Sequence, residues 1–396
     1  MHCLIEIECC EGMYMKRKQR RASIIPALSN NNHELFHSNL WKWLIETDPE
    51  FIKCFFKSYD INNEPIIKRE SDNLDLKIID KVTNKQYIIE NKLKSIPNYE
   101  QLERYKERQE DKNDYKTKYL LVFLIKNENL KIKDWKSISY IRLAKRLKEV
   151  LKERRKKSGI KKYYNILNEY CDYIINDFGE IKNSEYVKSK VYYFGEDDID
   201  KAHIDEGLKV IYQKMKSEKF MCELNKIIDI ERYDKKFGKM GYSLMPYLGY
   251  NHGKPCFTYR IQYKNWGKKR AELRKHTAME IQLEGNQYRH MVRLIKDNKN
   301  KAEKIDEDRQ KVYYKRAIGI FSRTDFLSIF KNDKGKEFTK YDMPTSIAIY
   351  KYCKIDKNIG DKPYVEDVAK YIKNDLDEIL KYVGKEKIKS FLQDLK

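Results

Sequence analysis

Residues 74–92 read LDLKIIDKVTNKQYIIENK, which is the pattern of two β-strands joined by a turn. Apolar residues alternate with polar ones in the first strand, whereas the second strand is an apolar run that ends in Glu90-Asn91-Lys92. Because side chains two apart on a strand project to the same face, we expect Glu90 and Lys92 to point into one site. Asp75 lies on the preceding strand, from which it can meet them across the hairpin.

The flanking sequence predicts an α/β layer around this hairpin. The expected elements are a helix over 34–45, one or two strands over 66–80, a strand over 86–93, a helix that opens after Pro97, a strand over 119–125 and a helix over 137–157. The apolar residues of the helices recur at helical spacing, and the last strand is an almost continuous apolar run, which is typical of burial on both faces. Helices that alternate with strands in this way indicate an α/β fold.

The pattern changes beyond Ser158-Gly159, so we place a domain boundary there. In the second half we expect helices over 163–177, 200–228 and 365–382, strands over 256–263, 277–283 and 346–353, and a loop over 238–253 because four of the fifteen glycines gather in it. These elements predict an α+β domain over residues 160–396.

Charge is distributed unevenly along the chain. The 396 residues carry a formal net charge of +22, but residues 1–130 hold 22 Lys+Arg against 21 Asp+Glu, whereas residues 131–160 hold 12 against 3. An excess of Lys and Arg favours a polyanionic partner, because cations that neutralise phosphates release condensed counterions. The helix over 137–157 is therefore either a nucleic-acid-binding surface or a merely solvated face. Its candidate phosphate-binding residues are Arg142, Lys145, Arg146, Arg154 and Arg155.

The cluster of Asp75, Glu90 and Lys92 suits phosphodiester hydrolysis. Carboxylates on adjacent strands can hold Mg²⁺ through hard oxygen ligands, and a lysine beside them can orient water or stabilise developing charge. The alternative is an ordinary pair of opposite charges across two strands. Glu90 follows three apolar or aromatic residues, which indicates a central strand, and a buried charge needs a partner. On the next helix, Gln101 and Tyr105 are one turn apart on one face.

In order and spacing, Asp75, Glu90-Asn91-Lys92 and Gln101-x-x-x-Tyr105 resemble the PD-(D/E)XK nuclease superfamily, and the last motif is similar to its RecB-like exonuclease branches. The phrases ELFHSNLWKWLIE, RESDNLDLKI, IIENKLKS and QLERY together resemble a bacterial group of that superfamily. The likeness covers about residues 33–145. It implies a restriction-endonuclease-like fold, a mixed sheet flanked by helices, and Mg²⁺-dependent cleavage of nucleic acid.

The resemblance also implies roles for single residues. Asp75 and Glu90 would be metal ligands, Lys92 the catalytic lysine, and Glu34 on the first helix an auxiliary acid that completes the metal shell. The match also includes Glu70, an acid without an assigned role, and Gln101 and Tyr105, which would contact the DNA backbone or support the site. The residue before Asp75 is Leu74 rather than the proline of the family name, a variation that the superfamily shows widely.

A competing motif shares one of these residues. His33-Glu34-Leu35-Phe36-His37 fits H-E-x-x-H, in which two histidines bind Zn²⁺ and the glutamate activates water in a metalloprotease. No third ligand follows in a recognisable context, so a zinc peptidase is the remote alternative.

The sequence thus predicts a basic arm over residues 1–32, a nuclease domain over 33–157 and a recognition, regulatory or oligomerisation domain over 160–396. The cofactor would be Mg²⁺, for which Mn²⁺ substitutes, and DNA is preferred to RNA as substrate, with a role in restriction or antiphage defence. An RNase on the same scaffold and a nucleic-acid-binding protein that never cleaves stay open, as does a homodimer or higher homo-oligomer. No stretch approaches the roughly 20 apolar residues of a membrane span, so we expect no membrane partner and a cytoplasmic location.

Overall fold

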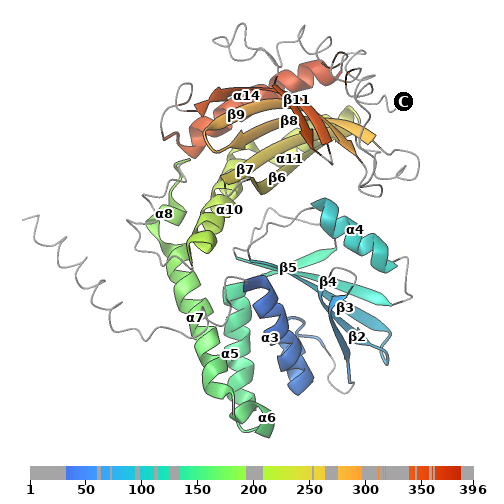
Figure 1. The fold of residues 1–396 in the computed structure, drawn as a ribbon, viewed down its shortest axis with the longest axis vertical. Coiled ribbons are helices and arrows are strands. Elements are labelled where there is room, and N and C mark those ends of the chain that lie inside the picture. The colour runs from blue at the N-terminus through green and yellow to red at the C-terminus, as the bar shows by residue number, and fades with distance from the viewer. Residues whose placement is uncertain are drawn as a thin grey trace, which may run out of the picture. The chain divides into compact units, whose positions relative to one another are not determined.

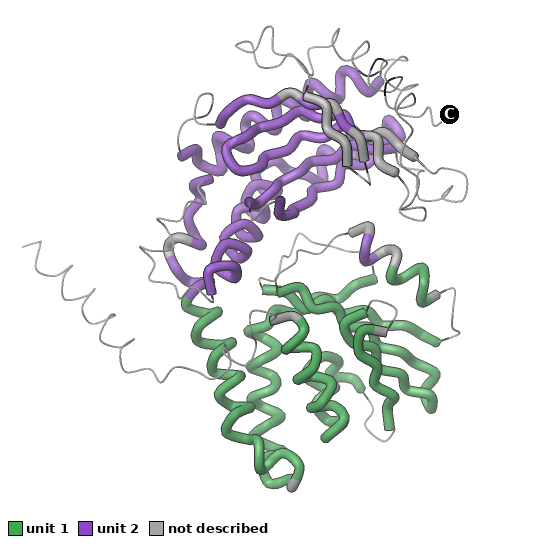
Figure 2. The backbone as a smooth tube through the Cα atoms, in the orientation of Figure 1, with its two compact units in different colours: residues 1–93, 105–124, 134–180 green, residues 94–104, 125–133, 181–396 purple. Residues whose placement is uncertain are grey.

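The computed structural model describes residues 33–59, 64–71, 74–93, 99–110, 115–124, 134–192, 208–251, 254–263, 275–296, 339–343, 346–355 and 362–384, together with residues 311, 315, 317 and 359. The predicted arm over 1–32 lies outside them. The chain forms two compact units, residues 1–93, 105–124 and 134–180 as unit 1 and residues 94–104, 125–133 and 181–396 as unit 2 (Figure 2). Unit 1 therefore extends about twenty residues beyond the boundary predicted at 158–159.

Unit 1 contains a mixed five-stranded sheet. Its strands are β1 (Ile66–Ser71), β2 (Leu74–Asp80), β3 (Lys85–Lys92), β4 (Lys116–Phe123) and β5 (Trp135–Ser139), in the order β1-β2-β3-β4-β5. The pairs β1–β2 and β2–β3 are antiparallel, whereas β3–β4 and β4–β5 are parallel. The predicted α/β class and mixed sheet are confirmed at this level.

Helices cover both faces of this sheet. The helices α3 (His33–Thr47), α5 (Tyr140–Arg154) and α7 (Tyr164–Asn183) lie on one side, and α4 (Tyr99–Glu110) reaches the other (Figure 1). Asn91 on β3 donates from Nδ2 to Ser38 Oγ on α3 at 2.9 Å, which fixes the first side. Lys77 on β2 donates from Nζ to Gln109 Oε1 on α4 at 2.6 Å, which fixes the second. Between α3 and β1 runs the short 3₁₀ helix Pro49–Cys54, and α6 (Ser158–Lys161) joins α5 to α7.

Strand β5 was not predicted. It has only five residues, and we assigned its last three to the start of the following helix. In the structure Trp135 and Ile138 are buried, and β5 completes the parallel part of the sheet beside β4. Ser139 ends the strand and caps α5, because its Oγ accepts from the backbone N–H of Arg142.

Unit 2 has an antiparallel six-stranded sheet in the order β10-β11-β9-β8-β7-β6. The strands are β6 (Tyr242–Asn251), β7 (Lys254–Tyr263), β8 (Lys275–Glu284), β9 (Gln287–Lys296), β10 (Thr339–Met343) and β11 (Ser346–Lys354). Its helices are α8 (Glu185–Lys188), α10 (Lys209–Ile228), α11 (Ile230–Lys239) and α14 (Val365–Val383), and apolar residues of α10, α11 and α14 pack on the sheet to form the core.

The loop predicted over 238–253 is wrong, because most of it is strand β6. Gly241 has a φ of +86° at the turn before the strand, as a glycine there should, but Gly249 lies within the strand. Ten rungs of pairing with β7 and burial of Tyr242, Leu244 and Leu248 outweigh the poor strand propensity of a single glycine. Strands β9 and β10 were also not predicted. No helix within the described ranges is both long and apolar enough to cross a membrane.

Candidate active site

The β2–β3 hairpin brings the two predicted metal ligands opposite each other. Leu76 pairs with Ile89, so Asp75 and Glu90 occupy the next opposed positions of the register. Asp75 is half-buried, and its Oδ2 accepts a hydrogen bond from the backbone N–H of Asn91 at 2.5 Å. This bond fixes the carboxylate of Asp75 at the end of the hairpin, beside β3.

Glu90 and Lys92 form a buried ion pair on one face of β3. Lys92 Nζ lies 2.7 Å from Glu90 Oε1, and the two side chains are only 8% and 3% exposed. The other carboxylate oxygen of Glu90, Oε2, is buried and has no hydrogen-bond partner among the residues that the structure describes. A buried carboxylate oxygen without a partner is costly unless water or an ion binds it.

The environment of Glu90 disfavours its charge. Burial raises the pKa of Glu90 to about 7, and although the Lys92 ammonium opposes this rise, the neighbouring Asp75 carboxylate adds to it. Two neighbouring carboxylates in a poorly hydrated site repel each other when both are ionised, and the Lys92 ammonium does not bring the pKa of Glu90 back to its ordinary value. Carboxyl groups with such displaced pKa values concentrate at functional sites.

These properties suit a divalent cation. Asp75 and Glu90 supply hard oxygen atoms. A cation between them would bind Oε2 of Glu90 and offset the repulsion between the two carboxylates. The described part of the chain contains no cluster of three or more His, Cys, Asp or Glu side chains that could hold a metal. Two carboxylates are enough for Mg²⁺, which usually keeps several waters and takes one or two carboxylates plus substrate phosphate oxygens.

The remaining predicted acids are not brought into this pair. Glu34 is the second residue of α3, and its side chain lies outside the described part of the structure. Glu70 lies across from Asp75 in the β1–β2 register, but its side chain is exposed and its carboxylate pairs with Arg69 Nη1 at 2.8 Å. The φ of +51° at Glu70 is unusual for a residue other than glycine.

The part of α4 that belongs to unit 1, residues 105–110, lies on the face of the sheet that carries Asp75, Glu90 and Lys92, because Gln109 binds Lys77 on that face. Gln101 is half-buried and is grouped with unit 2, whereas Tyr105 is buried and belongs to unit 1. Gln109 continues the same spacing by one more turn, and it is this residue that binds Lys77.

Two further residues of this face, Lys77 and Gln109, were not predicted. Both are buried, and Lys77 lies two residues after Asp75 and therefore on the same face of β2. The signal was present, since Lys77 interrupts an apolar strand and Gln109 extends the i, i+4 series of Gln101 and Tyr105.

The predicted nucleic-acid-binding residues divide into two groups. Arg142, Lys145 and Arg155 are exposed. Arg146, in contrast, donates from Nη1 to the backbone carbonyl of Cys54 at 2.9 Å, and Arg154 Nε lies 3.0 Å from the buried carboxylate of Asp48. Arg146 and Arg154 therefore fasten α5 to the 3₁₀ helix and its cap, and the other three remain available to a partner.

The second histidine of H-E-x-x-H lies in the interior. His37 is fully buried, its Nδ1 is hydrogen-bonded to the hydroxyl of Tyr170 at 2.7 Å, and its ring packs on those of Tyr140 and Tyr170. His37 on α3 therefore contacts Tyr140 on α5 and Tyr170 on α7, as a residue of the core does. The side chains of His33 and Glu34 are not described.

A scan against protein-family models, a search of curated proteins and a search of solved structures each found no match to this chain.

Proposed function

We propose that the protein is a Mg²⁺-dependent nuclease whose active site is the β2–β3 hairpin of unit 1. The observation that carries the proposal is the buried pair of Glu90 and Lys92 beside Asp75, with one oxygen of Glu90 left without a partner. Three antiparallel strands followed by two parallel ones, with helices on both faces, support a restriction-endonuclease-like core.

Each side chain has a distinct task in this proposal. Asp75 and Glu90 would hold the cation, and the backbone N–H of Asn91 keeps Asp75 in place. When bound, Mg²⁺ supplies positive charge that offsets the charge developing on the phosphate and lowers the pKa of water. The ammonium of Lys92, held by Glu90 at 2.7 Å, orients the attacking water or stabilises the charge on the phosphate oxygens.

The proposed substrate is nucleic acid, with DNA preferred to RNA. The net charge of +22 favours a polyanion, and the exposed cations Arg142 and Lys145 lie in the first half of α5. This helix starts directly after β5, whose carboxyl end lies at the same edge of the sheet as that of β3 because β3, β4 and β5 are parallel. Phosphate contacts there would hold a strand near the edge that carries Lys92.

The test is cleavage of labelled single- and double-stranded DNA and RNA of one sequence, with Mg²⁺ and with EDTA. We expect cleavage that depends on Mg²⁺. Lys92→Met should abolish this cleavage, whereas the control Lys81→Met, at an exposed turn, should leave it unchanged. Cleavage of RNA alone would assign an RNase on the same scaffold. Binding of DNA without cleavage in Mg²⁺ or Mn²⁺ would refute the nuclease.

A further inference from the structure

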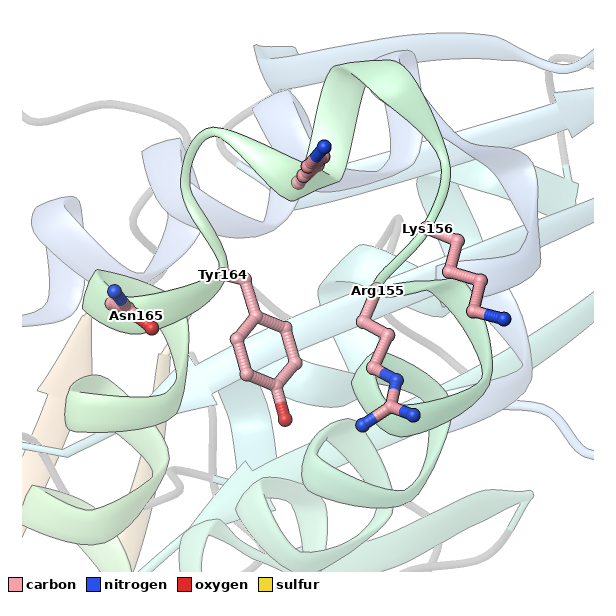
Figure 3. Close-up of a pocket in the computed structure, with 5 residues that line it drawn as sticks. Arg155, Lys156, Tyr164 and Asn165 are labelled. Atoms are coloured by element: carbon pink, nitrogen blue, oxygen red, sulfur yellow. The ribbon is translucent and has the colours of Figure 1, made fainter.

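A pocket lies at the turn where α5 passes through α6 into α7, and its lining includes Arg155, one of the predicted phosphate-binding residues. Its volume is about 350 Å³. The side chains of Arg155 and Tyr164 extend in the same direction in Figure 3, and Lys156 and Asn165 come from the same two helical ends. The lining residues are Arg155, Lys156, Lys161, Tyr164 and Asn165.

The basic side chains at this turn form two groups, those that pair with Asp48 and those that line the pocket. Lys157 Nζ lies 3.2 Å from Asp48 Oδ2, so this cation, like Arg154, is used to hold the fold. Arg155, Lys156 and Lys161 are exposed and have no ion-pair partner among the described residues. The pocket thus combines three positive charges with no carboxylate in its lining. Like charges gathered in one concavity raise the local potential and attract an anion.

We propose that this pocket binds a phosphate group of the nucleic-acid strand on which the β2–β3 site acts; this inference rests on the proposed function. The guanidinium of Arg155 matches a phosphate with two parallel N–H donors, and the two lysines contribute point charges. The hydroxyl of Tyr164 and the amide of Asn165 can complete the donor set. A phosphodiester carries one charge and four oxygens, which this lining can satisfy.

The position of the pocket predicts what it does for the reaction. Helix α5 has 15 residues, so its last residue lies about 22 Å from its first. The first residue comes directly after β5, at the edge of the sheet where β3 also ends. Because α5 lies on the face of the sheet opposite Asp75, Glu90 and Lys92, the path of a strand from the pocket to the hairpin is longer than this helix and spans more than about six nucleotides at roughly 3.4 Å for each. The pocket therefore contributes affinity and register, and the rate of the chemical step does not depend on it.

The experiment measures binding of a fluorescent 30-base-pair DNA by the full chain in EDTA at several salt concentrations. Arg155→Ala/Lys161→Ala is compared with Lys81→Ala/Lys116→Ala, which removes the same charge at exposed positions elsewhere in unit 1. We expect the pocket variant to raise Kd about tenfold at 0.1 M salt and to reduce the slope of log K against log salt by about 1. The control variant should stay within about twofold of the parent, and circular dichroism checks that both fold.

Equal Kd values for the two double variants would overturn the proposal. A second arm titrates inorganic phosphate and ATP against the parent. If these anions protect Arg155 and Lys161 from chemical modification while DNA affinity is unchanged in the pocket variant, the pocket belongs to a free phosphate compound and the assignment to nucleic acid is wrong. Single-turnover cleavage at saturating DNA separates the two proposals. If the pocket variant binds DNA weakly and the parent never cleaves it, the proposed nuclease activity is wrong and the proposed phosphate site stands.

Discussion

Glu90→Gln should change how the stability of the protein depends on pH. The pKa of Glu90 is raised from its ordinary value of 4.5 to about 7 in the folded protein. A carboxyl group with a raised pKa favours folding when it is protonated, so its contribution is fully present below about pH 4.5 and is lost as the pH rises through 7. In the parent, the free energy of unfolding should therefore fall over this window, whereas glutamine in this position does not titrate.

The size of the effect follows from the pKa difference. Because 1 pKa unit corresponds to about 1.4 kcal/mol, ionisation of Glu90 should cost about 2–3 kcal/mol of stability between pH 5 and pH 8. The difference in unfolding free energy between Glu90→Gln and the parent should rise by this amount over that range, whatever its value at pH 5.

Urea denaturation followed by tryptophan fluorescence can measure this difference, because Trp41, Trp43 and Trp135 all lie in unit 1. Glu149→Gln, at an exposed position of α5, controls for the loss of one carboxylate, and the Glu90→Gln difference should rise with pH relative to the difference measured for this control. A Glu90→Gln difference that is equally flat from pH 5 to pH 8 would show that Glu90 is not the strained carboxylate on which the proposed metal site depends.

Four further outcomes are expected. Mg²⁺ at ten times its dissociation constant should stabilise the parent by about 1.4 kcal/mol at pH 8. The affinity for Mg²⁺ should be about thirtyfold weaker at pH 5.5, because protons compete with the cation for Glu90. Melting curves with and without Mg²⁺ at the two pH values measure both effects. Arg154→Ala should lower the free energy of unfolding by about 1–3 kcal/mol, because the buried carboxylate of Asp48 loses one of its two cationic partners and keeps only Lys157. Arg155→Ala should stay within about 0.5 kcal/mol in the same urea titration. His37→Ala should destabilise by about 2–4 kcal/mol, and elemental analysis should find the same zinc content in the variant as in the parent, since the side chain is part of the core. Asp375→Asn should destabilise unit 2 by about 1–3 kcal/mol, because Asp375 accepts from the hydroxyl of Tyr288 and binds His290 in the core, and a cleavage assay should find the rate unchanged.

The hairpin was predictable because its signal is local. Alternating residues from Leu74 to Ile78 and the apolar run before Glu90 determine which side chains share a face, and the register of β2 with β3 follows from a short turn. Asp75, Glu90 and Lys92 therefore come together in the structure as the pattern indicates. Helix periodicity likewise located α3, α4, α5, α7, α10 and α14. Helix α7 continues to Asn183, beyond its predicted end at residue 177, and the predicted start of α10 at residue 200 lies outside the described residues.

Other features depend on contacts that a local pattern does not encode. Strand β5 is recognisable only beside β4, and β6 is a strand because β7 pairs along its whole length despite Gly249. The roles of Arg146 and Arg154 could not be separated from that of Arg155 by sequence, because all three belong to one basic run. Only the fold brings Asp48 and the Cys54 carbonyl to the first two.

The proposed active site is tested by the single-turnover rate of DNA cleavage in saturating Mg²⁺ for the parent, Asp75→Asn, Glu90→Gln and the control Glu149→Gln. We predict that both hairpin variants fold and lose at least about 100-fold in rate, as expected when a group that stabilises transition-state charge is removed, while the control matches the parent. If Asp75→Asn and Glu90→Gln both fold and cleave as fast as the parent, the proposed site is wrong.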